Sequence, residues 1–173
     1  NHAPRAYHSG DHEEIDWILQ RLRSEHQAVG GRVLVAAGVS LGGNALMRWA
    51  GEHGLAAREH IDAVAAICSP LDLAESGKAI GRGFNRQVYT RMFLRTMKPK
   101  ALAKLRQHPG LFVSERLRAA RDLYEFDNVF TAPLHGYRDT HDYWRRASAK
   151  PLLRRVQVPA LLVNALNDPF VPA

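Results

Sequence analysis

The first periodic segment of the chain predicts a helix over residues 11–24. Its apolar side chains recur at the three- and four-residue spacing of one helix face, as Ile15, Ile18, Leu19 and Leu22. Asp11 followed by Glu14 fits a capping box, in which two side chains bind the free N–H groups of a first helical turn. Gly30 and Gly31 then separate this helix from the next element.

Three short apolar runs bounded by turn residues predict strands. They cover residues 32–37, 61–67 and 160–164, and such runs are typical of strands that are buried on both faces of a parallel sheet. Residues 43–54, between the first two runs, carry a helical pattern formed by Ala45, Leu46, Trp49 and Ala50. Strands that alternate with helices favour the α/β class, with helices on both faces of a mainly parallel sheet.

From residue 71 to residue 148 the pattern is helical, in segments over 88–97, 100–107, 115–124 and 137–146. A helical block between two strands of a parallel sheet is typical of a cap over the carboxyl ends of the strands. We therefore predict an α/β core made of residues 1–70 and 149–173, with a helical cap insertion at residues 71–148.

Composition narrows the class of protein. The 173 residues are 46% hydrophobic and 24% charged, which suits one globular core. No run approaches the roughly 20 apolar residues of a membrane-spanning helix, and residues 1–30 lack a signal-peptide pattern, so we expect a cytoplasmic protein. The single Cys68 cannot form an internal disulfide. At the end of an apolar strand it is expected to be a packed thiol rather than a nucleophile.

The positive charge is concentrated in one region. Residues 71–157 hold 18 of the 24 Lys and Arg but 8 of the 17 Asp and Glu, a net charge of +10 against −3 elsewhere. One interpretation is attraction to anionic lipid, with peripheral membrane contact through a basic cap, and the other is the solvated outer face of helices. Nucleic-acid binding is disfavoured because no nucleic-acid motif accompanies these cations.

The first motif that carries chemistry is a glycine-rich turn at residues 38–42. Its sequence matches G-x-S-x-G, the nucleophile elbow that places a serine between a strand and a helix. Ser40 would be exposed to substrate on a strained turn whose flanking glycines, Gly38 and Gly42, lack a Cβ. The N–H of Leu41 would then point at a developing oxyanion. The alternative, a phosphate-binding turn, is disfavoured because G-x-G-x-x-G and a P-loop Lys are absent.

A second motif follows the last predicted strand. In this fold the acid of the triad lies on a loop after a strand, and Asp168 occupies such a position. Its role would be to hold a histidine in the required tautomer. The alternative is an ordinary Asx-turn before Pro169.

None of the nine histidines follows Asp168, so none has the chain position of the catalytic base. His135 and His141 are expected to be structural or to face substrate within the cap. His8 and His12 lack a nearby third ligand, so no metal site and no cofactor is predicted.

Residues 38–44, Gly-Val-Ser-Leu-Gly-Gly-Asn, resemble the elbow of the YheT-like α/β hydrolases, the bacterial relatives of the animal ABHD1, ABHD2 and ABHD3 branch. The family's other motifs are matched by residues 7–10 (Y-H-S-G), 125–127 (E-F-D), Thr131-Ala132, 135–137 (H-G-Y) and 168–170 (D-P-F). The resemblance implies an α/β-hydrolase fold with a helical cap and carboxylester hydrolysis, with lipase or phospholipase activity in some animal relatives.

By this resemblance Ser40 is the nucleophile and Asp168 the acid. The family's base lies in a downstream Gly-Gly-His segment and its second oxyanion donor in an upstream His-Gly loop, and neither has a counterpart here. We therefore expect the chain to be the central part of a longer protein, truncated at both ends and inactive by itself. Asn167 replaces an acid that is often found beside the catalytic one. The candidate functions are an esterase or lipase-like hydrolase, an acyltransferase of the same fold, and a non-catalytic binding protein, with a small-molecule or lipid ester as the ligand.

Overall fold

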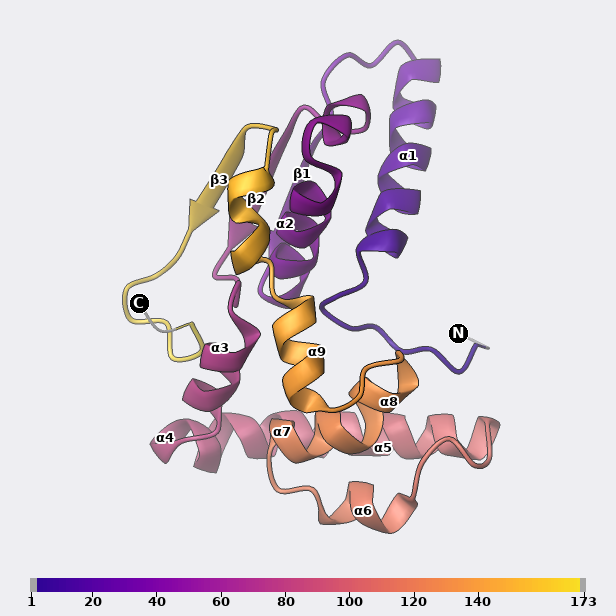
Figure 1. Ribbon diagram of the computed structural model, residues 1–173, viewed down its shortest axis with the longest axis vertical. Helices are drawn as coiled ribbons and strands as arrows, with labels where there is room; N and C mark the ends of the chain where they lie inside the picture. The colour runs from indigo at the N-terminus through magenta and orange to yellow at the C-terminus, as the bar shows by residue number, and fades with distance from the viewer. Residues whose placement is uncertain (1–2, 172–173) are drawn as a thin grey trace.

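The computed structural model describes residues 3–171, and a parallel sheet of three strands organises them (Figure 1). The strands are β1 (Val35–Val39), β2 (Ala63–Ile67) and β3 (Ala160–Val163), in that spatial order. Their register aligns Val39, Ile67 and Val163 at the carboxyl end. The predicted α/β class is confirmed, although β1 begins three residues later than its apolar run.

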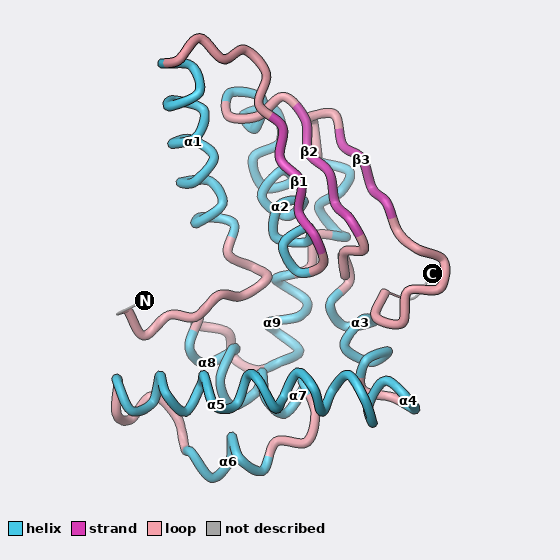
Figure 2. The backbone as a smooth tube through the Cα atoms, turned by 180° about the vertical axis from the view of Figure 1, so that it is seen from behind, coloured by secondary structure: helices cyan, strands magenta, loops and turns pink. Residues whose placement is uncertain are grey.

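Helices cover one face of this sheet. Helix α2 (Leu41–His53) lies against β1 and β2, and both α1 (His12–Ala28) and the 3₁₀ helix Lys150–Arg155 pack on α2. Figure 2 shows the strands from the opposite side, with α2 behind them. The core between these layers consists of Leu19, Leu46, Met47, Trp49, Ala50, Ala57, Ile61, Val64, Ala66, Ala149 and Val158.

The other face of the sheet is open, which contradicts the prediction of strands buried on both faces. Alternate residues of each strand point away from α2, and those of β1 and β3 are largely exposed: Val35 is 64% and Leu161 60% accessible. Apolar residues on both faces of a strand predict burial on both faces of the sheet, and these strands have that pattern. In residues 3–171 no element packs against the second face.

All of the regular structure between β2 and β3 up to residue 147 is helical. It comprises α3 (Leu73–Ile80), α4 (Gly83–Asn85), a π segment (Arg86–Thr90), α5 (Arg91–Gln107), α6 (Ser114–Ala119), α7 (Leu123–Phe126), a second π segment (Asp127–Thr131), α8 (Ala132–Leu134) and α9 (Thr140–Ala147). These helices lie beyond the carboxyl ends of the strands (Figure 1). Within residues 3–171 no helix combines the length and apolar character needed to cross a membrane.

Several predicted helix boundaries in this block are wrong. The two helices expected on either side of Pro99 are one helix, α5, because Arg95 and Pro99 are both exposed and water can bind the carbonyl that Pro99 leaves free. The helix expected over residues 115–124 is divided into α6 and α7. There the side chain of Asp122 accepts a hydrogen bond from the N–H of Glu125 (2.9 Å) and starts a new helix.

The predicted capping box of α1 is not formed either. Asp11 lies at the N-cap position but its side chain makes no capping bond. Both of its carboxylate oxygens instead accept hydrogen bonds from Nη2 of Arg5 at 2.9 Å. An ion pair satisfies the carboxylate better than a neutral N–H, because hydrogen bonds between charged groups are the stronger ones.

The buried side chain of Asn44 joins the two halves of the molecule. Its Nδ2 donates to the backbone oxygens of Ser9 (3.2 Å) and Ala147 (2.8 Å) and to Oγ of Ser9 (2.7 Å), and its Oδ1 accepts from the N–H of Ala149 (2.9 Å). Helix α2 is thereby bound both to the N-terminal loop and to the end of α9. Asn44 is fully buried, so water cannot replace any of these partners.

We expect Asn44→Ala to lower the free energy of unfolding by about 3 kcal/mol or more, because it leaves buried carbonyl and N–H groups without partners. Urea denaturation followed by circular dichroism measures this change. Asn164→Ala, at an exposed position after β3, is the matched control and should change stability by less than about 0.5 kcal/mol. Equal losses in the two variants would contradict this account.

Candidate active site

Ser40 lies in a strained turn between β1 and α2. Its backbone has φ 52° and ψ −126°, a conformation that residues other than glycine rarely adopt. Three hydrogen bonds hold it there: its N–H donates to the oxygen of Ile67 (2.9 Å), and its own carbonyl accepts from Gly43 (3.0 Å) and Asn44 (3.3 Å). Strain that the surrounding structure maintains in this way is typical of functional sites.

Two glycines allow the turn to close: Gly38, as the motif predicted, and Gly43 in place of the predicted Gly42. A Cβ on Gly38 would lie 2.5 Å from Cα of Gly43 and 2.6 Å from the oxygen of Gly42, and a Cβ on Gly43 would collide with the side chain of Ser69. A Cβ on Gly42 would have only the hydroxyl of Tyr7 nearby, at 3.9 Å. Close packing of β1 on α2 therefore requires Gly38 and Gly43, whereas the space at residue 42 is open.

We expect Gly38→Ala to destabilise the protein by more than about 3 kcal/mol, because backbone atoms cannot move away from the new methyl group. Gly42→Ala should be neutral or stabilising by up to about 1 kcal/mol, since alanine favours the first turn of a helix. Thermal denaturation of the two variants distinguishes the positions. Similar losses for both would show that the turn is tight along its whole length.

Ser40 opens onto a cavity of about 250 Å³ between the carboxyl end of the sheet and the helical block. Apolar side chains dominate its walls: Leu41, Pro70, Leu73, Ile80, Phe93, Met97, Leu123, Trp144, Phe170 and Val171. A few polar groups are interspersed, namely Tyr7, His8, Ser76, Asp127, Thr131 and Tyr143. A mainly apolar cavity with a small number of placed polar groups is the usual form of a small-molecule site.

Leu41 is the first residue of α2. The N–H groups of a first helical turn have no partner within the helix and lie at its positive end. The N–H of Leu41 therefore lies at the positive end of α2, next to Ser40. The Leu41 carbonyl, in the next peptide unit, accepts a hydrogen bond from Oγ of Ser9 (3.2 Å), which links the first turn of α2 to the N-terminal loop.

The structure places the loop of Asp168 against the same cavity. Oδ1 of Asp168 accepts hydrogen bonds from the N–H groups of Phe170 (2.8 Å) and Val171 (3.2 Å), so the Asx-turn weighed as the alternative is present. The turn directs Phe170 and Val171 into the cavity wall, and the Phe170 ring packs edge-on against Tyr89 with centroids 4.7 Å apart. Asp168 itself is not among the residues that line the cavity.

Reasoning from sequence missed His8 as a residue of this site. His8 is 7% exposed and lines the cavity with Ser40. Its Nδ1 accepts from the N–H of Gly10 (3.1 Å), and its ring lies 4.1 Å from the ring of His135. Burial, and next the neighbouring His135, lower the pKa of His8 to about 4, so its imidazole is neutral at pH 7. The matched Tyr-His-Ser-Gly motif was the signal that could have identified it.

Three other residues considered in the sequence, His135, His141 and Cys68, do not line the cavity of Ser40. His135 bridges the helical block and the N-terminal segment, with Nδ1 2.7 Å from the oxygen of Thr131 and Nε2 2.7 Å from the oxygen of Ala6. His141 is exposed against the ring of Tyr124. Cys68 is half-buried with a positive φ of 46°, so the expectation of a packed core thiol is wrong. The described residues contain no group of three His, Cys, Asp or Glu side chains that could hold a metal ion.

Asp127 is the acidic group of the cavity. It begins the second π segment, and its Oδ2 accepts a hydrogen bond from Nε1 of Trp144 (2.9 Å). Burial raises the pKa of Asp127 to about 6, although hydrogen bonds from Thr131 and Trp144 oppose this shift. A carboxyl group with a raised pKa takes up a proton more readily in the folded state, so its contribution to stability decreases as pH rises from about 4 to about 6.

Asp127→Asn keeps an oxygen for the Trp144 N–H and removes the buried charge. We expect the variant to be more stable than the wild type by about 2 kcal/mol at pH 7, and this advantage should disappear near pH 4. Urea denaturation of both proteins at pH 4, 5, 6 and 7 gives the difference. An advantage that does not depend on pH would mean that the carboxyl is not protonated in this range.

The sequence of this chain is similar to several curated proteins. No family model matches the sequence, and no solved structure is a significant match. Among curated proteins, YheT of Escherichia coli, provisionally named an esterase, is 36% identical over 99% of this chain and 49% of its own. The mouse phospholipase ABHD3 is 28% identical over 99% of this chain and 40% of its own. The medium-chain fatty acid ethyl ester synthase/esterase 2 of Saccharomyces cerevisiae is 30% identical over 96% and 40%.

A parallel sheet, a strained serine turn and a helical block before the third strand define an α/β-hydrolase fold. The chain is homologous to YheT and related α/β hydrolases over nearly all of its residues, which confirms the resemblance seen in its motifs. It spans about half the length of the curated relatives that it matches.

Proposed function

We propose that the protein is a serine hydrolase of carboxylic esters, with Ser40 as the nucleophile, Asp168 as the triad acid and the Leu41 N–H as an oxyanion donor. The observation that carries the proposal is the strained backbone of Ser40 at the mouth of an apolar cavity. The names of the relatives agree with it, since they describe an esterase, a phospholipase and an ethyl ester synthase/esterase.

In the proposed reaction Oγ of Ser40 attacks the ester carbonyl carbon and its proton passes to a histidine. The carbonyl oxygen takes up the negative charge, which the Leu41 N–H at the start of α2 would stabilise. The alcohol leaves with the proton from the histidine, and water then attacks the acyl-enzyme and releases the acid. Asp168, held by two backbone N–H groups, would orient the histidine.

The base is proposed to be the histidine of the family's Gly-Gly-His segment, which has no counterpart among residues 1–173. His8 is the competing candidate because it lines the same cavity. A general base works best when its pKa is close to the working pH. The pKa of about 4 and the occupied Nδ1 of His8 therefore argue for a role in shaping the cavity wall.

We propose that the helical block is a cap formed by residues 71–148. The apolar cavity beneath it favours an apolar acyl group as the part of the substrate that binds there. Its volume of about 250 Å³ and its mainly apolar walls suit an apolar group of small size. An ester of short or medium chain length fits this space. The second candidate function is acyl transfer to an alcohol, because the yeast relative's name joins a synthase and an esterase.

A fluorophosphonate probe tests the nucleophile. The full-length protein should be labelled at Ser40 and should hydrolyse p-nitrophenyl butyrate, and Ser40→Ala should lose both by a factor of at least about 10⁴. Ser76→Ala is the matched control, since Ser76 lines the same cavity from a regular helix and should retain labelling and turnover.

Labelling of Ser40→Ala at the wild-type rate would refute the nucleophile assignment. His8→Asn separates the two candidate bases, because the amide oxygen can still accept from Gly10. The variant should keep labelling within about tenfold, whereas a loss as large as that of Ser40→Ala would identify His8 as the base.

A further inference from the structure

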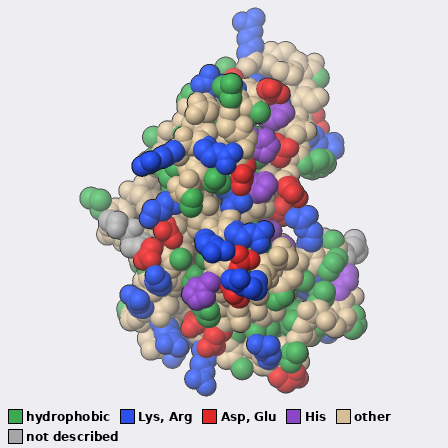
Figure 3. Space-filling view, in the orientation of Figure 1, with side chains coloured by type: hydrophobic (Ala, Val, Ile, Leu, Met, Phe, Trp, Pro, Cys, Tyr) green, Lys and Arg blue, Asp and Glu red, His purple; other side chains and the backbone are tan. Residues whose placement is uncertain are grey.

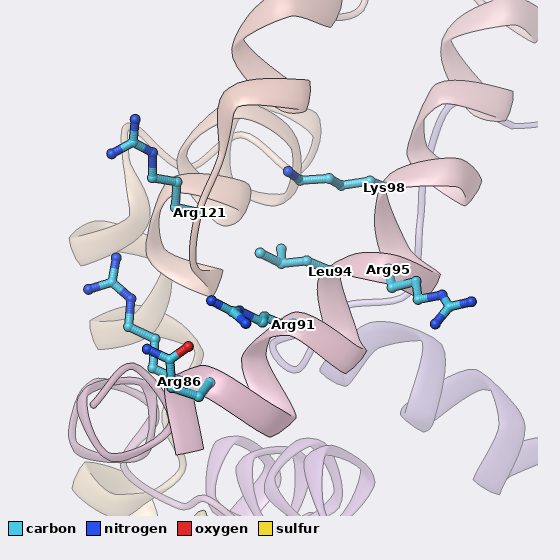
Figure 4. A pocket seen from close by; sticks show the side chains of 7 residues that line it. Arg86, Arg91, Leu94, Arg95, Lys98 and Arg121 are labelled. Carbon is cyan, nitrogen blue, oxygen red and sulfur yellow. The ribbon is translucent and has the colours of Figure 1, made fainter. Parts of the chain in front are cut away.

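Arginine side chains gather around a second hollow, on the far side of α5 from the sheet. It has a volume of about 580 Å³ and is lined by Arg86, Gln87, Arg91, Leu94, Arg95, Lys98 and Arg121. Figure 4 shows Arg91 and Lys98 extending across the opening toward Arg86 and Arg121, while Arg95 points away from it. No Asp or Glu is among the lining residues.

These cations lack acidic partners. In residues 3–171 the guanidinium groups of Arg86, Arg91, Arg95 and Arg121 form no ion pair. The carboxylate of Glu125, in α7, accepts a hydrogen bond from the Arg121 backbone N–H (2.6 Å). On the face seen in Figure 3, by contrast, blue and red side chains are interspersed. A hollow with only positive groups therefore has an unbalanced potential that attracts an anion.

Lys98 holds two walls of the hollow in a fixed arrangement. Its Nζ donates to the backbone oxygens of Arg118 (2.8 Å) and Ala120 (2.5 Å), which binds α5 to the segment that carries Arg121. An ammonium group has three donors, so one remains for a ligand. Guanidinium forks together with one ammonium donor are the groups that best recognise a phosphoryl oxygen.

An apolar stripe runs beside these cations. Phe84, Val88 and Met92 are 72%, 40% and 50% exposed, and their four-residue spacing places them along one side of the helical segment that leads into α5. Arg91 and Arg95 follow Val88 and Met92 by three residues, so they lie one turn further along the same side. Exposed apolar side chains next to arginines are typical of a helix that lies in a membrane interface.

We propose that this surface, formed by the arginine hollow and the stripe of Phe84, Val88 and Met92, docks the protein on anionic phospholipid. A headgroup phosphate would occupy the hollow and the three apolar side chains would enter the lipid boundary. The charge of the unpaired arginines argues for an anionic membrane, and the exposed stripe argues against a free anion as the only ligand. The proposal does not require Ser40 to be the nucleophile. It would place α5 between lipid and the cavity, because Phe93 and Met97 of the same helix line the cavity.

Vesicle flotation tests the docking surface with the full-length protein. The protein should bind vesicles of phosphatidylcholine with one third phosphatidylglycerol and not those of phosphatidylcholine alone. Replacing Arg86, Arg91 and Arg121 by Gln should weaken binding by on the order of a hundredfold, from about fivefold for each cation. The control replaces three exposed arginines elsewhere, Arg32, Arg154 and Arg155, by Gln and has the same net charge. It should weaken binding only a few-fold.

Two further measurements identify the ligand. Phe84→Ala with Met92→Ala should weaken binding to anionic vesicles by about tenfold or more, since apolar insertion is lost. Inorganic phosphate at 10 mM should leave vesicle binding unchanged at constant ionic strength. Equal weakening by the two arginine triplets, binding unaffected by the Phe84 and Met92 changes, or displacement by inorganic phosphate would overturn the proposal. The last two outcomes would point instead to association by charge without apolar insertion and to a free phosphate as the ligand, respectively.

Discussion

The hydrogen bonds of the Asn44 side chain are the interaction on which the arrangement of the site depends. One amide group binds the helix that follows Ser40 to the loop of Ser9 and to the end of α9. The loop brings His8 to the cavity, and the end of α9 returns the chain to the sheet. Because the amide is buried, these segments cannot separate without exposing several polar groups at once. The strained serine turn is thus supported from outside the strand and helix that form it.

The structure can be predicted from the sequence where interactions between neighbouring residues determine it. The G-x-S-x-G motif predicts the elbow and the need for glycine at Gly38, whereas the need for glycine at Gly43 depends on the packing of Ser69 against α2. The loop of Asp168 and its Asx-turn are equally local, whereas the position of this loop beside the cavity depends on packing. Catalytic roles remain predictions in both cases, since the geometry describes a site and not a reaction.

Other features could not be predicted because they depend on contacts between distant segments. Periodicity cannot tell that Pro99 lies on the exposed side of a continuous α5, nor that Arg5 competes for the carboxylate of Asp11. His8 lies in an irregular loop without any period, and its neighbour His135 is 127 residues away in sequence. The open face of the sheet was missed because apolar residues on both faces of a strand say nothing about which face is covered.

Burial of two titratable groups in the cavity changes how many protons each of them binds when the protein folds. A measurement of overall stability against pH would not detect these changes. Near pH 5 the folded state holds almost one extra proton on Asp127, whose pKa is about 6, and has given up almost one from His8, whose pKa is about 4. The two changes nearly cancel in the proton linkage, so the combined contribution of Asp127 and His8 to stability would be almost independent of pH there. The cost of desolvating both groups is nonetheless present. A molecule with a flat pH profile can therefore contain a buried acid and a buried base that are each far from their ordinary state, and only titration of the individual residues would reveal them.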